Sequence, residues 1–189
     1  MTRSNPALSR PSSALSRRSS LAALMVLGVG SLGGCGHPPA PASAPTALKD
    51  QDAPVFKRAS LNGPAIDMSA LRGQVVVVKF FAKYCVPCRK TLPEFQGLVS
   101  KRNDVQFIGI DEDDDESDAR LMVSTYALTF PVIHDVGNVL SGRFRVTDMP
   151  STVVIGPDGK VRWLGRFDRT ADDISNVIDH VKRGGGPLP

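Results

Sequence analysis

Two cysteines separated by two residues, Cys85 and Cys88, are the side chains of this sequence best suited to covalent chemistry. A C-x-x-C pair that follows a strand and opens a helix is the layout of a dithiol redox site. The thiolate is the reactive form of cysteine, and the unpaired N–H groups and partial positive charge of a helix N-terminus lower a thiol pKa. We therefore expect a lowered pKa at Cys85, helped by Lys83, Arg89 and Lys90, with Cys88 one turn on closing the disulfide.

The segments around the cysteines have the composition that this layout needs. Residues 74–81 are β-branched and aromatic apart from Lys79, which predicts a buried central strand. Residues 86–102 are compatible with a helix, and Pro87 falls in its first turn, where a missing N–H costs nothing. Pro93 is expected to kink this helix.

Two structural interpretations compete with a redox site. A structural zinc needs four ligands, whereas His134 and His180 are far from the cysteines and in no ligand spacing. A purely structural disulfide is the other alternative, but so short a loop restricts the unfolded chain little.

The sequence also resembles a known family. Residues 80–89, FFAKYCVPCR, resemble the active site of thioredoxin-fold proteins, nearest to the membrane-tethered TlpA/ResA-like branch. Residues 61–63, 68–74, 130–133 and 149–160 resemble further segments of that branch, so the resemblance covers about residues 54–183. It implies a thioredoxin-like three-layer α/β/α sandwich with a central mixed sheet.

The resemblance also implies an activity. Cys85 would attack a protein disulfide and Cys88 would resolve the mixed disulfide, without metal or organic cofactor. The substrate-binding residues would be Tyr84, Val86, Pro87, Met149 and Pro150, with a cis Met149–Pro150 bond facing the cysteines. The resemblance favours the reducing direction, for example in cytochrome c maturation, which would need an electron donor in the membrane.

The rest of the pattern agrees with an α/β sandwich. Further strands are expected at 56–61, 105–110, 152–155 and 160–164, and further helices at 117–128, 138–145 and 172–182. The acidic run 111–118 fails the calcium-loop pattern, so we expect a solvated turn there, and we expect His134 in a loop.

Two other activities are alternatives with recognisable sequence requirements. A copper-handling protein of the Sco type has three residues between its cysteines, and this chain has two. A peroxiredoxin-type peroxidase has a PxxxTxxC approach to its cysteine, which residues 77–85 do not match.

The N-terminal region predicts export. Residues 1–34 hold four arginines, no acidic residue and a short apolar segment, as in a signal peptide, and they end in Leu32-Gly33-Gly34-Cys35, which resembles a lipobox. We expect a lipid anchor on Cys35 in the bilayer, a protein facing the periplasm or cell exterior, a disordered Pro/Ala-rich tether at 35–53, a domain at 54–183 and a disordered tail at 184–189. Without the leader, 19 Lys and Arg balance 19 Asp and Glu, so no nucleic-acid partner is indicated.

Proton transfer is where the sequence departs from its relatives. Thioredoxins carry an aspartate six residues before the first cysteine, where this chain has Lys79, and ResA-like proteins often carry a glutamate where it has Thr91. We expect Glu94 or a desolvated Lys79 to accept the proton of Cys88. The alternative is that Lys79 reaches the surface, Glu94 is solvated and water accepts the proton.

Overall fold

A five-stranded sheet is the centre of the computed structural model, which describes residues 48–188. Its strands are β3 (Val76–Phe81), β4 (Gln106–Asp111), β5 (Val132–His134), β6 (Ser151–Ile155) and β7 (Val161–Gly165). They lie in the order β5-β4-β3-β6-β7, so that β3 is central. The neighbours β3, β4 and β5 are parallel, whereas β6 is antiparallel to both β3 and β7. The predicted central mixed sheet is therefore confirmed.

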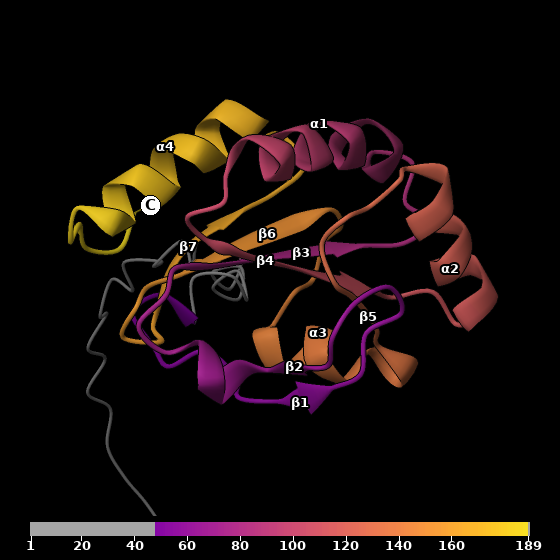
Figure 1. Ribbon diagram of the computed structural model, residues 1–189, viewed down its shortest axis with the longest axis horizontal. Coiled ribbons are helices and arrows are strands. Elements are labelled where there is room, and N and C mark those ends of the chain that lie inside the picture. The colour runs from indigo at the N-terminus through magenta and orange to yellow at the C-terminus, as the bar shows by residue number, and fades with distance from the viewer. Residues whose placement is uncertain (1–47, 189) are drawn as a thin grey trace, which may run out of the picture. The chain divides into compact units, whose positions relative to one another are not determined.

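Helices cover both faces of this sheet (Figure 1). One face carries α1 (Cys88–Lys101), α2 (Glu116–Thr125) and α4 (Ala171–Lys182). The other carries α3 (Val139–Phe144), the short 3-10 helices η2 (Met68–Leu71) and η3 (Val136–Asn138), and the two-stranded hairpin of β1 (Lys57–Arg58) and β2 (Ile66–Asp67). This is the three-layer α/β/α arrangement that the sequence predicts.

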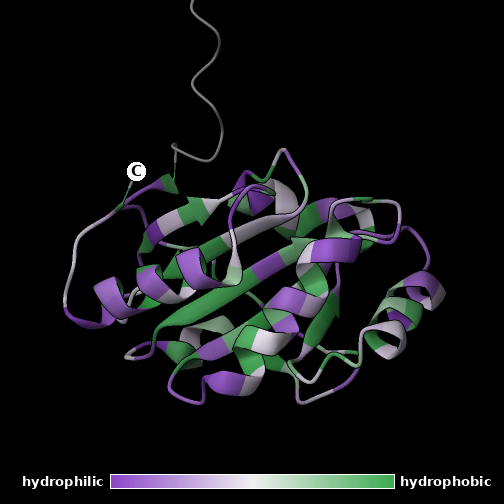
Figure 2. Ribbon diagram, turned by 90° about the horizontal axis from the view of Figure 1, so that it is seen from above, coloured by the Kyte–Doolittle hydropathy of each residue, from purple (hydrophilic) through white to green (hydrophobic). Residues whose placement is uncertain are grey.

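The central strand explains the two hydrophobic cores. All six residues of β3 are buried, because successive side chains of a strand point to opposite faces and both faces are covered. Val77 and Phe81 pack in the cluster under α1 and α4, while Val78 and Phe80 pack in the cluster beside α3. Figure 2 shows the corresponding concentration of hydrophobic residues in the strands and the mixed character of the helices.

Several boundaries differ from those expected. The helix predicted at 86–102 begins at Cys88, so that Pro87 is its N-cap, and it continues through Pro93 to Lys101. The strand predicted at 56–61 is reduced to β1, since its partner β2 offers only two residues for pairing. His134, expected in a loop, ends the three-residue strand β5, which is too short to show a period in the sequence.

The packed chain also extends beyond the domain boundaries inferred from sequence. Leu48 is buried, and residues 50 and 53 donate backbone hydrogen bonds to the carbonyls of Val161 and Gly159 at 2.8 and 2.9 Å. Residues 48–53, predicted as tether, therefore belong to the folded unit. In the predicted tail, Leu188 donates to the carbonyl of Arg162 at 2.9 Å. Cys35 and the leader lie outside the described residues. Among residues 48–188, no helix is long and apolar enough to span a bilayer.

Candidate active site

The two cysteines of the C-x-x-C motif form a disulfide at the junction of β3 and α1. The S–S distance is 2.05 Å and the two Cα atoms are 5.3 Å apart. Phe81 ends β3 in the buried core, and Cys88 is the first residue of α1. The strand and the helix thus fix the disulfide just beyond the carboxyl end of the central strand.

The two sulfur atoms have different surroundings. The backbone N–H of Cys88 is shared between two acceptors of Cys85, its carbonyl oxygen at 3.1 Å and its Sγ at 3.2 Å, so the first N–H of α1 also reaches that sulfur. Hydrogen bonds to the charged form of a group lower its pKa, and a helix N-terminus adds a favourable potential. The exposed fraction is 6% for Cys85 and 0% for Cys88. Cys85 is therefore better placed than Cys88 to be a stabilised, accessible thiolate when the pair is reduced.

The residues expected to bind substrate surround this pair. Tyr84 and Val86, on either side of Cys85, are 62% and 67% exposed, and Pro87 is exposed as well. The Met149–Pro150 peptide bond is cis, as the resemblance implies. Met149 packs against the cluster that contains both cysteines. The structure thus brings the apolar residues of two separate segments to the same region.

The first three residues of the acidic run support the active-site loop. Residues Asp111, Glu112 and Asp113 are all buried, so the expected solvated turn is wrong for this part of the run. The N–H of Glu112 donates to the carbonyl of Phe81 at 2.9 Å, and the N–H of Lys83 donates to Oδ2 of Asp113 at 2.8 Å. Because β3 and β4 are parallel and end together, the run is buried against the loop that leads to Cys85.

Burial changes the protonation of these carboxyl groups. It raises the pKa of Asp111 to about 8, with the charges of Asp113 and Glu112 as further causes, although the N–H of Asp113 opposes the shift. Burial likewise raises the pKa of Glu112. Sequence reasoning missed these residues, and the available signal was their position at the carboxyl end of a strand parallel to β3.

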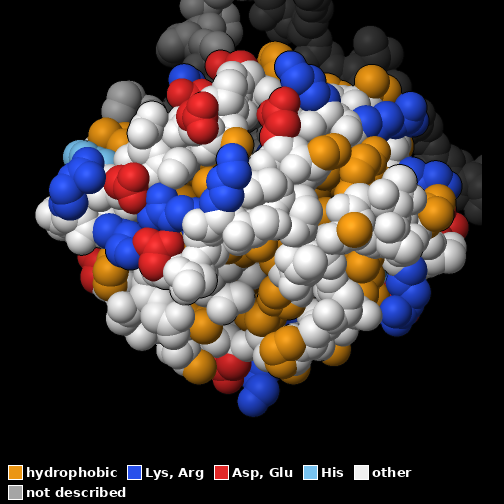
Figure 3. Space-filling model, turned by 45° about the horizontal axis from the view of Figure 1, so that its top comes forward, with side chains coloured by type: hydrophobic (Ala, Val, Ile, Leu, Met, Phe, Trp, Pro, Cys, Tyr) orange, Lys and Arg blue, Asp and Glu red, His pale blue; other side chains and the backbone are white. Residues whose placement is uncertain are grey.

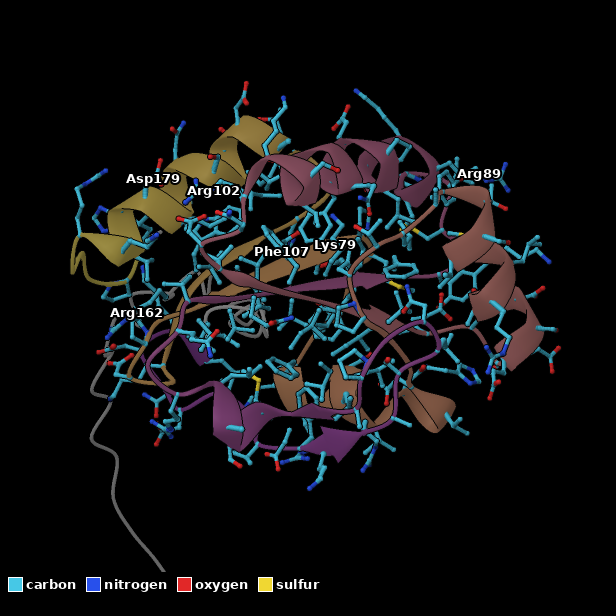
Figure 4. The ribbon with its side chains drawn as sticks, in the orientation of Figure 1. Lys79, Arg89, Arg102, Phe107, Arg162 and Asp179 are labelled. Atoms are coloured by element: carbon cyan, nitrogen blue, oxygen red, sulfur yellow. A yellow bond between two sulfur atoms is a disulfide. The ribbon has the colours of Figure 1, made fainter. Side chains whose placement is uncertain are left out.

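The basic residues near the motif contribute less positive potential than expected. Nζ of Lys83 lies 2.6 Å from Oδ1 of Asp118, so this charge is compensated. A surface pocket beside the disulfide is lined by Lys83, Tyr84 and Arg89 together with four aspartates of residues 113–118. Figure 4 shows Arg89 at the end of α1 that faces α2. The potential at Cys85 therefore owes more to the helix N-terminus than to these side chains.

The two expected proton acceptors are placed very differently. Lys79 is 2% exposed, whereas Glu94 is exposed on α1. Lys79 donates to Oγ1 of Thr152 at 3.2 Å, and burial lowers the pKa of its ammonium group to about 8, although Glu94 opposes the shift. Lys79 therefore does not reach the surface.

The folded unit offers no cluster of metal ligands. Across residues 48–188 no group of three or more His, Cys, Asp or Glu side chains is arranged to hold a metal. Nε2 of His134 lies 2.7 Å from the carbonyl oxygen of Asp113. His134 is therefore engaged with the backbone that follows β4.

The sequence of this chain is similar to those of known proteins. The AhpC/TSA family model matches residues 50–164. The thiol-disulfide oxidoreductase ResA of Bacillus cereus is 34% identical over 133 residues, which is 69% of this chain and 77% of the relative. This chain belongs to the AhpC/TSA family, as a ResA-like thiol-disulfide oxidoreductase with a thioredoxin fold.

A further sequence relative and a solved structure are also similar to this ResA-like oxidoreductase. ResA of Bacillus subtilis is 27% identical, over 70% of this chain and 75% of the relative. A crystal structure described as a putative thiol:disulfide interchange protein DsbE from Chlorobium tepidum is 25% identical with a TM-score of 0.65, covering 70% of this chain and 96% of that one. The folded unit of the ResA-like chain thus corresponds to nearly the whole of a solved oxidoreductase-like structure.

Proposed function

We propose that Cys85 and Cys88 exchange a dithiol for a disulfide with protein substrates, in the reducing direction. The observation that carries the assignment of roles is the bond from the Cys88 N–H to Sγ of the slightly exposed Cys85. Tyr84, Val86, Pro87 and the Met149–Pro150 segment form the substrate-binding surface. Their exposure or their packing against the cysteine cluster supports this role.

The reaction proceeds in two exchanges. The Cys85 thiolate attacks one sulfur of a substrate disulfide, so that a mixed disulfide forms and the first substrate thiolate leaves and takes up a proton. Cys88 then loses its proton and attacks Sγ of Cys85. The Cys85–Cys88 bond forms, and the second substrate thiolate leaves with the electron pair and takes up a proton. Two electrons pass from the protein to the substrate, and the protons that Cys85 and Cys88 release to solvent balance those that the two substrate thiolates take up from it.

Trapping tests this division of labour. Cys88→Ser should accumulate mixed disulfides through Cys85, because the resolving thiol is missing, whereas Cys85→Ser should trap far less. Non-reducing electrophoresis followed by mass spectrometry identifies the trapped proteins. Equal trapping by the two variants would contradict the assignment, and failure of the wild-type protein to reduce any protein disulfide would contradict the proposed function.

We further propose that the protein is exported and anchored in a membrane by lipid on Cys35, where it receives electrons from a membrane donor. Apocytochrome c precursors, whose cysteines must be reduced before haem attachment, are the proposed class of substrate. Support for export and anchoring comes from the lipobox-like Leu32-Gly33-Gly34-Cys35, and the relatives named thiol-disulfide oxidoreductase ResA support the exchange of cysteine disulfides.

Anchoring has its own test. Cys35→Ala should move the protein from the membrane to the soluble fraction without loss of activity in solution, because residues 48–188 form the folded unit. Several acyl chains hold a protein stably at a bilayer, whereas an unmodified N-terminus does not. Detection of an unmodified N-terminus at or beyond Cys35 by mass spectrometry would contradict lipidation.

A further inference from the structure

A lysine is buried in the layer behind the disulfide. Lys79 lies at the centre of β3, on the same face as Val77 and Phe81, which pack in one cluster with both cysteines. Its Nζ is 3.2 Å from Oγ1 of Thr152 and 5.7 Å from the centroid of the Phe95 ring. Figure 4 shows Lys79 between β3 and α1. The ammonium group is thus held under the active-site helix, away from water.

A second buried polar group, the hydroxyl of Thr91, lies on the buried face of α1. Thr91 is buried, and its Oγ1 has no hydrogen-bond partner within the described part of the chain. Thr91 is one of the buried positions of α1, with Cys88 one turn before it and Phe95 one turn after it. Thr91 therefore lies along the helix between the resolving cysteine and the ring near Lys79, and its hydroxyl bonds to neither Cys88 nor Lys79.

The elements packed around Lys79 supply few charges. From α1, Glu94 favours the protonated lysine. On β4 the paired residue is Gly109, which has no side chain, and the carboxyl group of Asp111 follows two positions on. On β6 the paired residue is Thr152. The buried residues of α4 in this cluster are Ile174, Val177, Ile178 and Val181.

We propose that the buried ammonium group of Lys79 stabilises the Cys88 thiolate of the resolving step by its charge, through the apolar layer beneath α1, where a charge is little screened. Lys79 is then a positioning residue that acts through Cys88. This inference rests on the proposed function, because it concerns the second of its two exchanges. The proton that leaves Cys88 is matched by the proton that the departing substrate thiolate takes up from solvent, so Lys79 need not change its own protonation during a turnover.

The arrangement also makes resolution sensitive to pH. Burial keeps the pKa of Lys79 near 8, so its charge declines as the pH rises through that value. A nearby thiolate favours the protonated lysine, and a protonated lysine favours the thiolate by the same free energy. Replacing the lysine by an apolar residue should therefore raise the thiol pKa of Cys88.

Both exchanges can be timed with one probe, DTNB. Reduced full-length protein carrying Cys35→Ala releases one thionitrobenzoate when Cys85 attacks, and a second when Cys88 resolves the mixed disulfide. Stopped-flow absorbance across a pH series separates these two phases. Lys79→Met should slow the second phase about tenfold at neutral pH and move its pH midpoint up by about one unit, as expected for the loss of one poorly screened charge. The first phase should change little.

Three more variants complete the test. Thr91→Val keeps the side-chain shape and removes a hydroxyl that bonds to neither Cys88 nor Lys79, so it should change the second phase little. Glu94→Gln should slow the second phase mainly near pH 8, where the lysine charge needs support. Glu94→Gln decides the matter if Lys79→Met does not fold, since an unchanged second phase near pH 8 would overturn the role of Lys79. Lys101→Met removes a lysine charge at the other end of α1 and should leave both phases unchanged.

The outcomes separate this inference from the function on which it depends. Absence of the first phase in the wild-type protein would contradict the proposed chemistry of Cys85. A normal first phase, together with an unchanged pH midpoint of the second phase in Lys79→Met, would overturn the role of Lys79 alone. Equal slowing of both phases at every pH would also overturn it, because that result indicates a general structural defect.

Discussion

At the scale of single residues, the contrast between Cys85 and Cys88 shows how position sets reactivity. The two side chains are chemically identical and three residues apart, yet one accepts the first N–H of α1 and the other is fully enclosed. Burial disfavours a thiolate, and a hydrogen bond from a helix N-terminus favours it. Burial also makes Lys79 and Asp111 unusual, since each is an ionisable group inside the core.

The buried carboxyl group of Asp111 leads to a prediction about pH and stability. Its native pKa is about 8, whereas an unfolded aspartate ionises near pH 4. Between these values the native state holds a proton that the unfolded state has released, so stability falls as the pH rises and levels off above about 8. In Asp111→Asn this loss should disappear, so that the variant gains roughly 1–3 kcal/mol relative to wild type between pH 5 and 8.

Urea unfolding of the oxidised proteins at several pH values measures this difference. Asp114→Asn is the matched control, because Asp114 lies in the same acidic run but is exposed. A constant difference between Asp111→Asn and wild type across the series would mean that Asp111 is ionised in the native protein.

At the scale of elements, the placement of α1 decides the geometry of the site. Its N-terminus is held by the disulfide and its buried face by the cluster under α1 and α4. Its C-terminus is held by Arg102, whose guanidinium group binds Asp104 and reaches Asp179 on α4 at 2.8 Å (Figure 4). The helix is therefore fixed at both ends, which holds Cys88 in place beside the end of β3.

Removing the Arg102 side-chain contacts should loosen α1 against α4. Arg102→Met keeps most of the apolar stem but loses the charge-assisted hydrogen bonds to Asp104, Ser175 and Asp179. We expect a loss of about 1–2 kcal/mol in the free energy of unfolding, since Arg102 is mostly buried while its partners are partly exposed. Urea unfolding at low and high salt measures it. Lys101→Met should change stability little, and an equal loss in both variants would contradict a specific role for Arg102.

At the scale of the whole molecule, acidic and basic side chains are interspersed over the face that carries α1 and α4 (Figure 3). This agrees with the near-neutral balance of the chain after its leader. The folded unit is closed near β7 by segments from both of its ends, through Leu48 and Leu188. The start of the folded unit is consequently part of its core rather than a spacer.

Truncating Leu48 should therefore destabilise the domain. Leu48 packs in the cluster beside α3, and removing a buried leucine side chain costs roughly 2 kcal/mol or more. We expect Leu48→Ala to lose about 2 kcal/mol in urea unfolding, at the low end because the site lies at the edge of the core. The control is Val55→Ala, a half-exposed apolar residue nearby in sequence, which should cost much less. A negligible loss of unfolding free energy in Leu48→Ala would contradict the assignment of residues 48–53 to the folded unit.

Features that depend on local pattern could be predicted from the amino-acid sequence. The run 74–81, the C-x-x-C spacing and the helix that follows specify a strand, a redox pair and its activating helix terminus, since each rests on neighbours within a few residues. The strands expected at 152–155 and 160–164 also rest on local pattern, and the structure has β6 and β7 there. The short strand β5 was not predicted, because three residues are too few to show an alternating pattern.

The burial of particular polar residues depends on how the strands and helices pack. Lys79 meets Thr152, and Lys83 meets Asp113, across 73 and 30 residues of chain. Such contacts follow from which strands become neighbours, and a single charged residue within an acidic run or an apolar strand does not reveal them. Asp111, Thr91 and Leu48 were misjudged or left unassigned for the same reason: burial is a property of the packed layers, and it changes the chemistry of a side chain without changing its sequence neighbours.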